Sequence, residues 1–195
     1  MTRDTADPVV RCGLQVPPQA PAVVTARDAG VPVISEVELA LWFLPDTQLI
    51  ATTGTNGKTT TVSLLAKLCE AANRKVALAG NVSPAALRAL IGALDAAGLS
   101  PEDWHSDSSL PDSVVHALPQ VWVLELSSFQ LALCSSLQAD ASAFLNLSVD
   151  HLDWHASMDH YAAAKQLIFQ AAGVAVFSRD DDATEPWSRA VQKQI

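Results

Sequence analysis

A glycine-rich segment at residues 54–60 lies between an apolar stretch at 48–53, which predicts a strand, and an amphipathic stretch at 58–72, which predicts a helix. This order constrains the fold strongly, because a glycine-rich turn from a strand into a helix is typical of phosphate-binding α/β proteins. Gly54 and Gly57 permit backbone angles closed to other residues, so successive N–H groups can converge on phosphate oxygens at the helix start. The segment therefore predicts a nucleotide-phosphate site, and a tight turn without a ligand is the alternative.

Individual residues of this segment have the chemistry that such a site needs. Lys58 would neutralise the β- and γ-phosphates of ATP, and Thr59 would offer its hydroxyl to Mg²⁺. The general pattern of these loops would place a further glycine at Thr52, and this chain lacks it. The predicted ATP-binding residues are Gly54, Thr55, Asn56, Gly57, Lys58, Thr59 and Thr60.

Predicted strands and helices alternate along the rest of the chain. Strands are predicted at 31–34, 48–53, 76–79, 121–126, 141–147 and 174–178, and helices at 35–44, 58–72, 84–97 and 158–171. This alternation predicts an α/β fold with a mostly parallel sheet and helices on both faces. Residues 98–119 predict a surface insertion, residues 148–155 a loop, and the polar run after Arg179 no further element.

Composition narrows the class of protein. The chain of 195 residues is 49% apolar and 17% charged, an ordinary globular balance, and its apolar runs are far shorter than the roughly 20 residues of a membrane-spanning helix. A formal net charge of −9 without a basic stripe disfavours binding to nucleic acid. Cys12, Cys69 and Cys134 are scattered without metal-site spacing, and the N-terminus does not resemble a secretory signal. We therefore expect a cytoplasmic protein with reduced thiols and no membrane insertion.

Several ordered motifs resemble the Mur ligase superfamily. Residues 54–60 are similar to its shortened phosphate loop, which accounts for Thr52, and folylpolyglutamate synthetases are similar at the same point. Residues 124–131, Leu-Glu-Leu-Ser-Ser-Phe-Gln-Leu, resemble the branch of the superfamily that adds D-glutamate. The resemblance runs in order over about 31–182, apart from the insertion. The other motifs that agree with this branch are 80–87, 146–153 and 161–169.

The resemblance implies metal-binding and catalytic roles. Glu125, at the end of an apolar strand, is implied to bind Mg²⁺ with Thr59, and a strand-end salt bridge is the alternative. His151 is implied to bind a second Mg²⁺, and a hydrogen-bonded structural histidine is the alternative. Lys165 is implied to be carbamylated, which needs a depressed pKa and would create anionic oxygens that help to hold Mg²⁺; a solvated lysine is the alternative. The implied catalytic residues are Lys58, Glu125, His151 and Lys165.

Two further sets of polar residues have competing interpretations. His151 and His155 are four residues apart, but the sequence offers no third ligand at a characteristic spacing, so we do not expect a zinc site. Asn81, Ser127 and Ser128 follow predicted strands, where a parallel sheet exposes its ligand crevice. They are expected to bind substrate, and helix capping or turn formation is the alternative for the serines.

The resemblance also implies a reaction and a domain plan. Members of this branch join D-glutamate to UDP-N-acetylmuramoyl-L-alanine through an acyl phosphate, with ATP and Mg²⁺. We expect residues 1–46 to be the tail of an N-terminal α/β domain that binds the UDP group, residues 47–195 to be part of the central ATP-binding domain, and the C-terminal domain to be absent. A noncatalytic ATP-binding module is the main alternative, and a folylpolyglutamate synthetase is the second.

Overall fold

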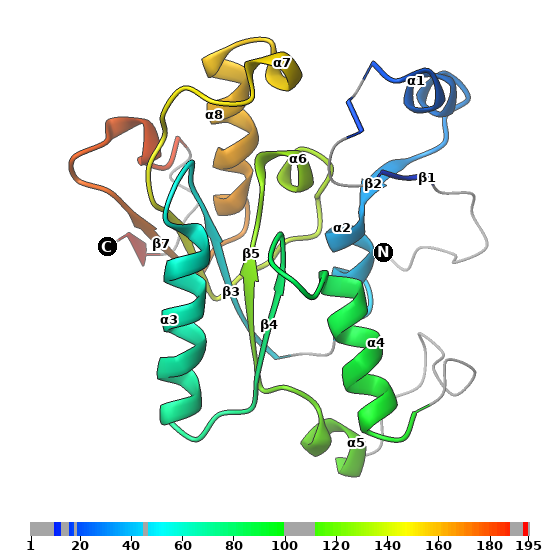
Figure 1. Ribbon diagram of the computed structural model, residues 1–195, viewed down its shortest axis with the longest axis vertical. Coiled ribbons are helices and arrows are strands. Elements are labelled where there is room, and N and C mark those ends of the chain that lie inside the picture. The colour runs from blue at the N-terminus through cyan, green and yellow to red at the C-terminus, as the bar shows by residue number, and fades with distance from the viewer. Residues whose placement is uncertain are drawn as a thin grey trace.

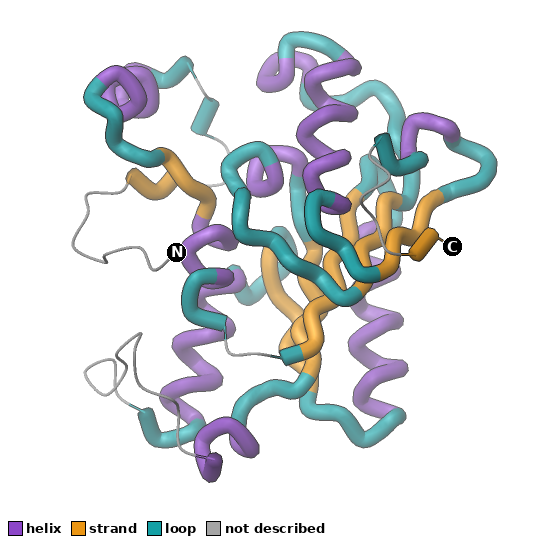
Figure 2. The backbone as a smooth tube through the Cα atoms, turned by 180° about the vertical axis from the view of Figure 1, so that it is seen from behind, coloured by secondary structure: helices purple, strands orange, loops and turns teal. Residues whose placement is uncertain are grey.

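The computed structural model describes residues 10–12, 16–17, 19–44, 47–99, 112–187 and 193–194. Within these ranges the centre of the molecule is a sheet of six strands in the order β4-β5-β3-β6-β7-β8, and all neighbours are parallel. Figure 2 shows the strands in the middle with helices around them. The predicted α/β fold is confirmed. The strands are β3 (Gln48–Thr53), β4 (Val76–Gly80), β5 (Val121–Glu125), β6 (Ala141–Phe144), β7 (Val174–Phe177) and β8 (Lys193–Gln194).

Helices cover both faces of this sheet. Val62, on the helix after β3, is fully buried with Val121 and Val123 of β5 on one face. Leu90 and Trp122 belong to the larger core on the other face. Successive residues of a strand point to opposite faces, so β5, buried at every position, has helices on both sides. In Figure 1, α3 and α4 lie on either side of β3, β5 and β4. The main helices are α2 (Glu36–Leu41), α3 (Lys58–Ala71), α4 (Ala86–Ala96) and α8 (Met158–Gln166).

The parallel register aligns the carboxyl ends of three neighbouring strands. Thr52 of β3 and Gly80 of β4 are both paired with Glu125 of β5. Gly80 has a φ of +109°, and a Cβ atom there would overlap the carbonyl oxygen of Glu125, so glycine permits this close approach. The loop after β3 and the turn after β4 therefore lie on either side of the Glu125 carboxylate, at the strand ends where open parallel sheets bind ligands.

The N-terminal part of the chain forms a small separate sheet and then joins the main core. Strands β1 (Val10–Cys12) and β2 (Val33–Ser35) pair in parallel, and α1 (Pro21–Asp28) lies between them in the sequence. The side chain of Ser35 caps α2 by accepting a hydrogen bond from the N–H of Glu38. Val37 and Ala40 of α2 are buried in the main core. Core packing thus begins before the expected domain boundary at residue 46.

Glu38 connects α2 through hydrogen bonds to the segment that follows the short helix α6 (Ser128–Leu131). Its side chain is 1% exposed and accepts hydrogen bonds from the N–H and hydroxyl groups of Ser135 and Ser136, and from the Trp42 indole N–H. Burial raises the pKa of Glu38, but the bonds from Ser136, Ser135 and Trp42 outweigh burial and lower it from 4.5 to about 2. The carboxylate is therefore buried in its ionised form, held by hydrogen-bond donors.

Two local expectations were wrong, and the expected insertion contains a helix that was not predicted. Residues 148–155 are not loop throughout, because α7 (Leu152–His155) forms after His151. Within the expected insertion, α5 (Asp112–Ala117) is helical, while residues 100–111 lie outside the described residues. The run after Arg179 contains a 3₁₀ turn at Asp182–Thr184 and then β8, which pairs with β7. Short elements of this kind are stabilised by tertiary packing more than by their own sequence pattern.

Candidate active site

The segment between β3 and α3 has the backbone geometry of an anion site. Gly57 is the N-terminal cap of α3 with a φ of +80°, a left-handed conformation that favours glycine. The N–H groups of Gly57, Lys58, Thr59 and Thr60 have no hydrogen-bond partner among the described residues. Unpaired N–H groups at the start of a helix attract anions, helped by the helix dipole. The predicted phosphate loop therefore has free donors at its C-terminal half.

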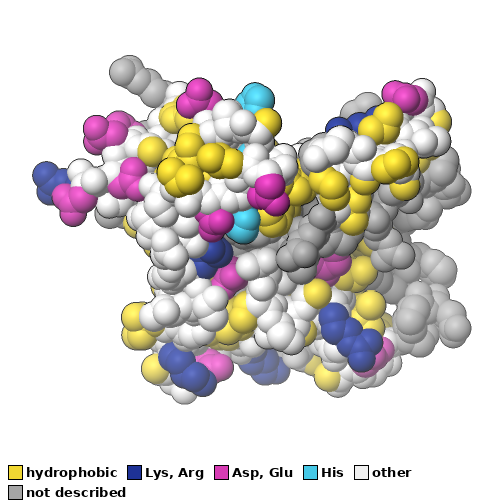
Figure 3. Space-filling view, turned by 45° about the horizontal axis from the view of Figure 1, so that its top comes forward, with side chains coloured by type: hydrophobic (Ala, Val, Ile, Leu, Met, Phe, Trp, Pro, Cys, Tyr) yellow, Lys and Arg dark blue, Asp and Glu magenta, His cyan; other side chains and the backbone are white. Residues whose placement is uncertain are grey.

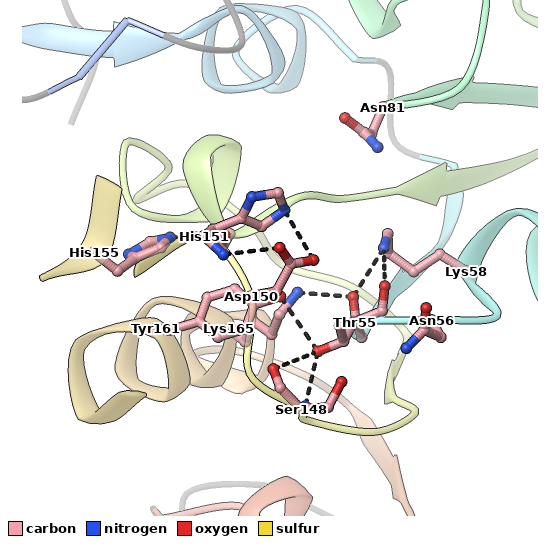
Figure 4. Close-up of polar contacts among 12 residues, drawn as sticks. Thr55, Asn56, Lys58, Asn81, Ser148, Asp150, His151, His155, Tyr161 and Lys165 are labelled. Atoms are coloured by element: carbon pink, nitrogen blue, oxygen red, sulfur yellow. Dashed lines mark hydrogen bonds and ion pairs between the residues drawn. The ribbon is translucent and has the colours of Figure 1, made fainter. Parts of the chain in front are cut away.

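Lys58 curls back over this loop. Its Nζ atom donates hydrogen bonds of 2.9 Å to the carbonyl oxygens of Gly54 and Thr55. Figure 4 shows the ammonium group beside the loop rather than extended into solvent. The side chain is half-buried, so its charge lies where an anion on the loop would be bound.

Glu125 is a buried carboxylate beside the first turn of α3. It is 2% exposed, and its oxygens accept hydrogen bonds from the Thr59 hydroxyl at 2.7 Å and the Asn81 side-chain amide at 2.8 Å. Both donors are neutral, and the only ion pairs within the described ranges join Lys67 to Glu70 and His151 to Asp150. A buried carboxylate without a protein cation, next to a hydroxyl oxygen, suits a hard divalent cation such as Mg²⁺.

Lys165 is buried beneath the phosphate loop. Its side chain is 2% exposed, and its Nζ atom donates hydrogen bonds to the carbonyl oxygen of Gly54 at 2.8 Å and to the Thr53 hydroxyl at 3.3 Å. The same atom lies 4.8 Å from the centre of the Tyr161 ring. Burial, reinforced by the charge of Lys58, lowers the pKa of Lys165 from 10.5 to about 7. Lys165 is thus not a solvated lysine. Near neutral pH a substantial fraction of its side chain is the neutral amine.

His151 lies at the rim of the site on strained backbone. Its φ is +51°, and its Nε2 atom is 3.5 Å from a carboxylate oxygen of Asp150, with side-chain exposures of 45% for both residues. The ring contacts Phe129 and Tyr161, with centroid distances of 4.8 and 5.9 Å. In the described part of the chain, no three His, Cys, Asp or Glu side chains form a group that could hold a metal. His151 is therefore near the loop and its neighbours but is not in one cluster with Glu125.

The two serines and His155 are engaged in internal contacts. Ser127 caps α6, accepting a hydrogen bond from the Gln130 N–H while the Gln130 side chain accepts one from the N–H of Ser127. Ser128 is 1% exposed and its hydroxyl lies 2.8 Å from Nε2 of His155, which is also buried. Burial, with the charges of His151 and Lys165, lowers the pKa of His155 to about 4. Ser127 therefore caps a helix, as the alternative interpretation proposed. A substrate-binding role for Ser127 or Ser128 stays a prediction.

Sequence reasoning missed residues that hold the loop in place. The Thr55 hydroxyl accepts a hydrogen bond from the Ser148 N–H at 3.0 Å and lies 3.3 Å from the buried Tyr161 hydroxyl. The Asn146 side chain contacts the backbone of Asn56. Asn146, Ser148 and Tyr161 all belong to motifs that carried the family resemblance, which is the one sequence signal that could have identified them. Figure 4 shows Thr55, Ser148 and Tyr161 meeting beside Lys165.

The site lies on one face of the molecule. In Figure 3 the end that carries α7 and α8 is turned forward, and basic, acidic and histidine side chains gather there.

Among the described residues, no helix combines the length and the apolar character that a membrane span requires.

Known proteins resemble this chain in sequence. Residues 52–195 match the family described as Mur ligase middle domain. The chain is 48% identical over 168 residues to the UDP-N-acetylmuramoylalanine–D-glutamate ligase of Paraburkholderia phymatum, and 46% identical over 171 residues to that of Burkholderia mallei. Each alignment covers 83% of this chain and 30% of the relative, so the chain spans about 30% of the length of these curated relatives.

Solved structures share the fold. The MurF ligase of Thermotoga maritima, in complex with ADP, matches 95% of this chain and 47% of its own, with a TM-score of 0.56 and 19% identity. The UDP-N-acetylmuramate:L-alanyl-γ-D-glutamyl-meso-diaminopimelate ligase of Neisseria meningitides matches 95% of this chain and 57% of its own, with a TM-score of 0.58 and 17% identity. At these identities the likeness concerns the fold alone.

Proposed function

The chain belongs to the Mur ligase family, through the middle domain that residues 52–195 match, and on that premise we propose that it is the ATP-binding part of a D-glutamate ligase. The ligase would join D-glutamate to UDP-N-acetylmuramoyl-L-alanine in cytoplasmic peptidoglycan-precursor synthesis. Relatives with that name are 46% to 48% identical to this chain, which favours this branch over folylpolyglutamate synthetases. One structural observation carries the proposal. The Thr59 hydroxyl and the buried Glu125 carboxylate lie side by side where free N–H groups begin α3.

The reaction would proceed in two balanced steps. A carboxylate oxygen of the L-alanyl group attacks the γ-phosphorus of ATP, the bond from that phosphorus to the β–γ bridging oxygen breaks, and ADP leaves. The amine of D-glutamate then attacks the acyl carbon, an amide forms, and inorganic phosphate leaves while the amine loses a proton. The loop N–H groups and Lys58 would bind the triphosphate and hold the γ-phosphorus in place, since phosphoryl transfer depends on positioning and charge stabilisation.

The donors of the site fit Mg²⁺. Thr59 and Glu125 would hold one ion, and His151 with a carbamylated Lys165 would hold a second. When bound, Mg²⁺ supplies positive charge that offsets the negative charge of the phosphates. The lowered pKa of Lys165 supports this assignment, because only a neutral amine can add to CO₂. Asn81, whose side chain bonds to Glu125, and Ser127 and Ser128 would lie next to the bound substrate.

A chimeric enzyme tests this function. Residues 31–187 would replace the matching segment of the Paraburkholderia phymatum ligase, and phosphate release would be measured with each substrate left out in turn. We expect release only when ATP, UDP-N-acetylmuramoyl-L-alanine and D-glutamate are all present, and none with Lys58→Ala. A chimera that folds and binds ATP but never releases phosphate would favour a noncatalytic ATP-binding module. Glutamate transfer to a folate instead would favour the folylpolyglutamate synthetase alternative.

A further inference from the structure

The segment after β6 runs along the phosphate loop and is bonded to it residue by residue. The N–H of Leu145 donates to the carbonyl oxygen of Thr53 at 3.0 Å, and the N–H of Thr55 donates to the carbonyl oxygen of Asn146 at 3.0 Å. A Cβ atom at Gly54 would lie only 3.1 Å from Cβ of Leu145, which shows how closely the two segments pack. The first half of the loop is therefore supported by this neighbouring segment.

Asn146 adds a two-point contact at the tip of the loop. Its Oδ1 atom accepts a hydrogen bond from the N–H of Asn56 at 2.9 Å, and its Nδ2 atom donates one to the carbonyl oxygen of the same residue at 3.1 Å. Asn56 itself is exposed, and these are its only hydrogen bonds among the described residues. One amide side chain thus fixes both polar groups of the peptide backbone at a solvent-exposed tip.

This contact divides the N–H groups of the loop into two sets. Those of Thr55 and Asn56 are bound to Asn146, one to its carbonyl oxygen and one to its side chain. Those from Gly57 onward to Thr60 are free. A loop in which all of these groups were free could turn its tip peptide in several directions and would lose that freedom when phosphate binds. Because Asn56 is already held, less conformational entropy is lost when the free N–H groups of residues 57–60 bind phosphate.

We propose that Asn146 is a positioning residue that presets the phosphate loop for the triphosphate by clamping the backbone of Asn56. The inference rests on the proposed function for its ligand, ATP. Asn146 acts through the loop backbone and leaves the phosphates to the N–H groups of 57–60 and to Lys58. Its side-chain amide is suited to this task because it offers one acceptor and one donor side by side, matching the N–H and C=O groups of a single residue.

Amide hydrogen exchange of the 195-residue chain without nucleotide tests the clamp itself. In Asn146→Ala we expect the Asn56 amide to exchange about tenfold faster, because its side-chain acceptor is removed, while α3 and β5 keep their exchange rates. Asn146→Asp keeps an acceptor for the Asn56 N–H and is expected to keep that amide protected. Unchanged exchange at Asn56 in Asn146→Ala, or faster exchange over the whole sheet, would overturn the proposal.

Equilibrium binding of a fluorescent ATP analogue tests the consequence. Asn146→Ala is expected to raise the Kd about tenfold, which corresponds to about 1.4 kcal/mol. The matched control is Asn73→Gly, an exposed asparagine beyond the C-terminus of α3 with a φ of +58°, which should leave the Kd unchanged. If wild type binds and Asn146→Ala binds equally well, the inference is wrong. If wild type fails to bind, the proposed function fails, and the exchange measurement still decides whether the clamp exists.

Discussion

The hydroxyl of Thr59 donates a 2.7 Å hydrogen bond to Oε2 of Glu125 and so joins the first turn of α3 to the end of β5. Thr59 is exposed whereas Glu125 is buried, so the pair reaches from solvent to the edge of the sheet. The second oxygen of Glu125 accepts from Asn81, which follows β4. Three neighbouring strands therefore contribute to one polar cluster, and metal binding and phosphate binding would meet there.

Lys58→Ala is expected to weaken ATP binding by roughly 100-fold, because the ammonium group that lies over the loop is removed. The fold should persist, since Lys58 is only half-buried and bonds to loop carbonyl groups. Titration with a fluorescent ATP analogue measures the affinity, and far-UV circular dichroism checks the fold. Lys67→Ala is the matched control, because Lys67 is on the same helix with a side chain that is 76% exposed. Equal affinity of the Lys58 variant and wild type would contradict the phosphate-loop assignment.

Glu125→Gln is expected to reduce the dependence of ATP binding on Mg²⁺ while changing the shape of the site little. A neutral amide is a poorer ligand for Mg²⁺ than a carboxylate, so the tightening of ATP binding by Mg²⁺ should fall on the order of tenfold. The measurement is ATP affinity with and without Mg²⁺. Glu70→Gln, an exposed position on α3, should respond like wild type. Full Mg²⁺ dependence in Glu125→Gln would show that the metal is held elsewhere.

Lys165 is expected to take up CO₂ as a carbamate at a pH where ordinary lysines do not. Burial and the charge of Lys58 lower its pKa to about 7, so the neutral amine becomes the main form as the pH rises through about 7 rather than 10.5. With ¹³C-labelled bicarbonate, NMR should show one carbamate signal that grows over this pH window and is absent in Lys165→Arg. Lys67→Arg should leave the signal in place. No signal from wild type at pH 8 would rule out this modification in the isolated chain.

Glu38→Gln is expected to destabilise the fold by about 2 kcal/mol, because an amide cannot accept all of the bonds that Ser135, Ser136 and Trp42 donate. The folded-state pKa of Glu38 is lowered from 4.5 to about 2, so its ionised form contributes stability above pH 4.5. That contribution is lost as the pH falls from about 4.5 toward 2. Urea unfolding of wild type and variant at several pH values measures the difference, which should shrink over this window. Asp95→Asn, at an exposed position on α4, serves as the control, and a constant difference would refute the pH argument.

Much of the fold could be predicted because its signals are local. Apolar runs such as 121–125 and the helical period after Lys58 determine which segments become strands and helices, and the structure matches them closely. Element ends were less accurate: β6 stops at Phe144, and α8 becomes a 3₁₀ turn at Leu167. The strand order β4-β5-β3-β6-β7-β8 and the short helices α6 and α7 depend on contacts between distant segments, which no local pattern contains.

The sequence by itself predicted a phosphate loop at residues 54–60, because glycine at positions 54 and 57 and lysine at 58 supply backbone freedom and charge that can be read from the residue types alone. Only the tertiary structure decided what surrounds it. The alanines around Lys165 do not show whether it is solvated or, as the family resemblance implies, has a depressed pKa; the fold buries it under Gly54 and thereby lowers its pKa. Asn146 reaches Asn56 across 90 positions of the chain. Burial and long-range hydrogen bonds arise only when segments pack together, so these properties belong to the folded molecule.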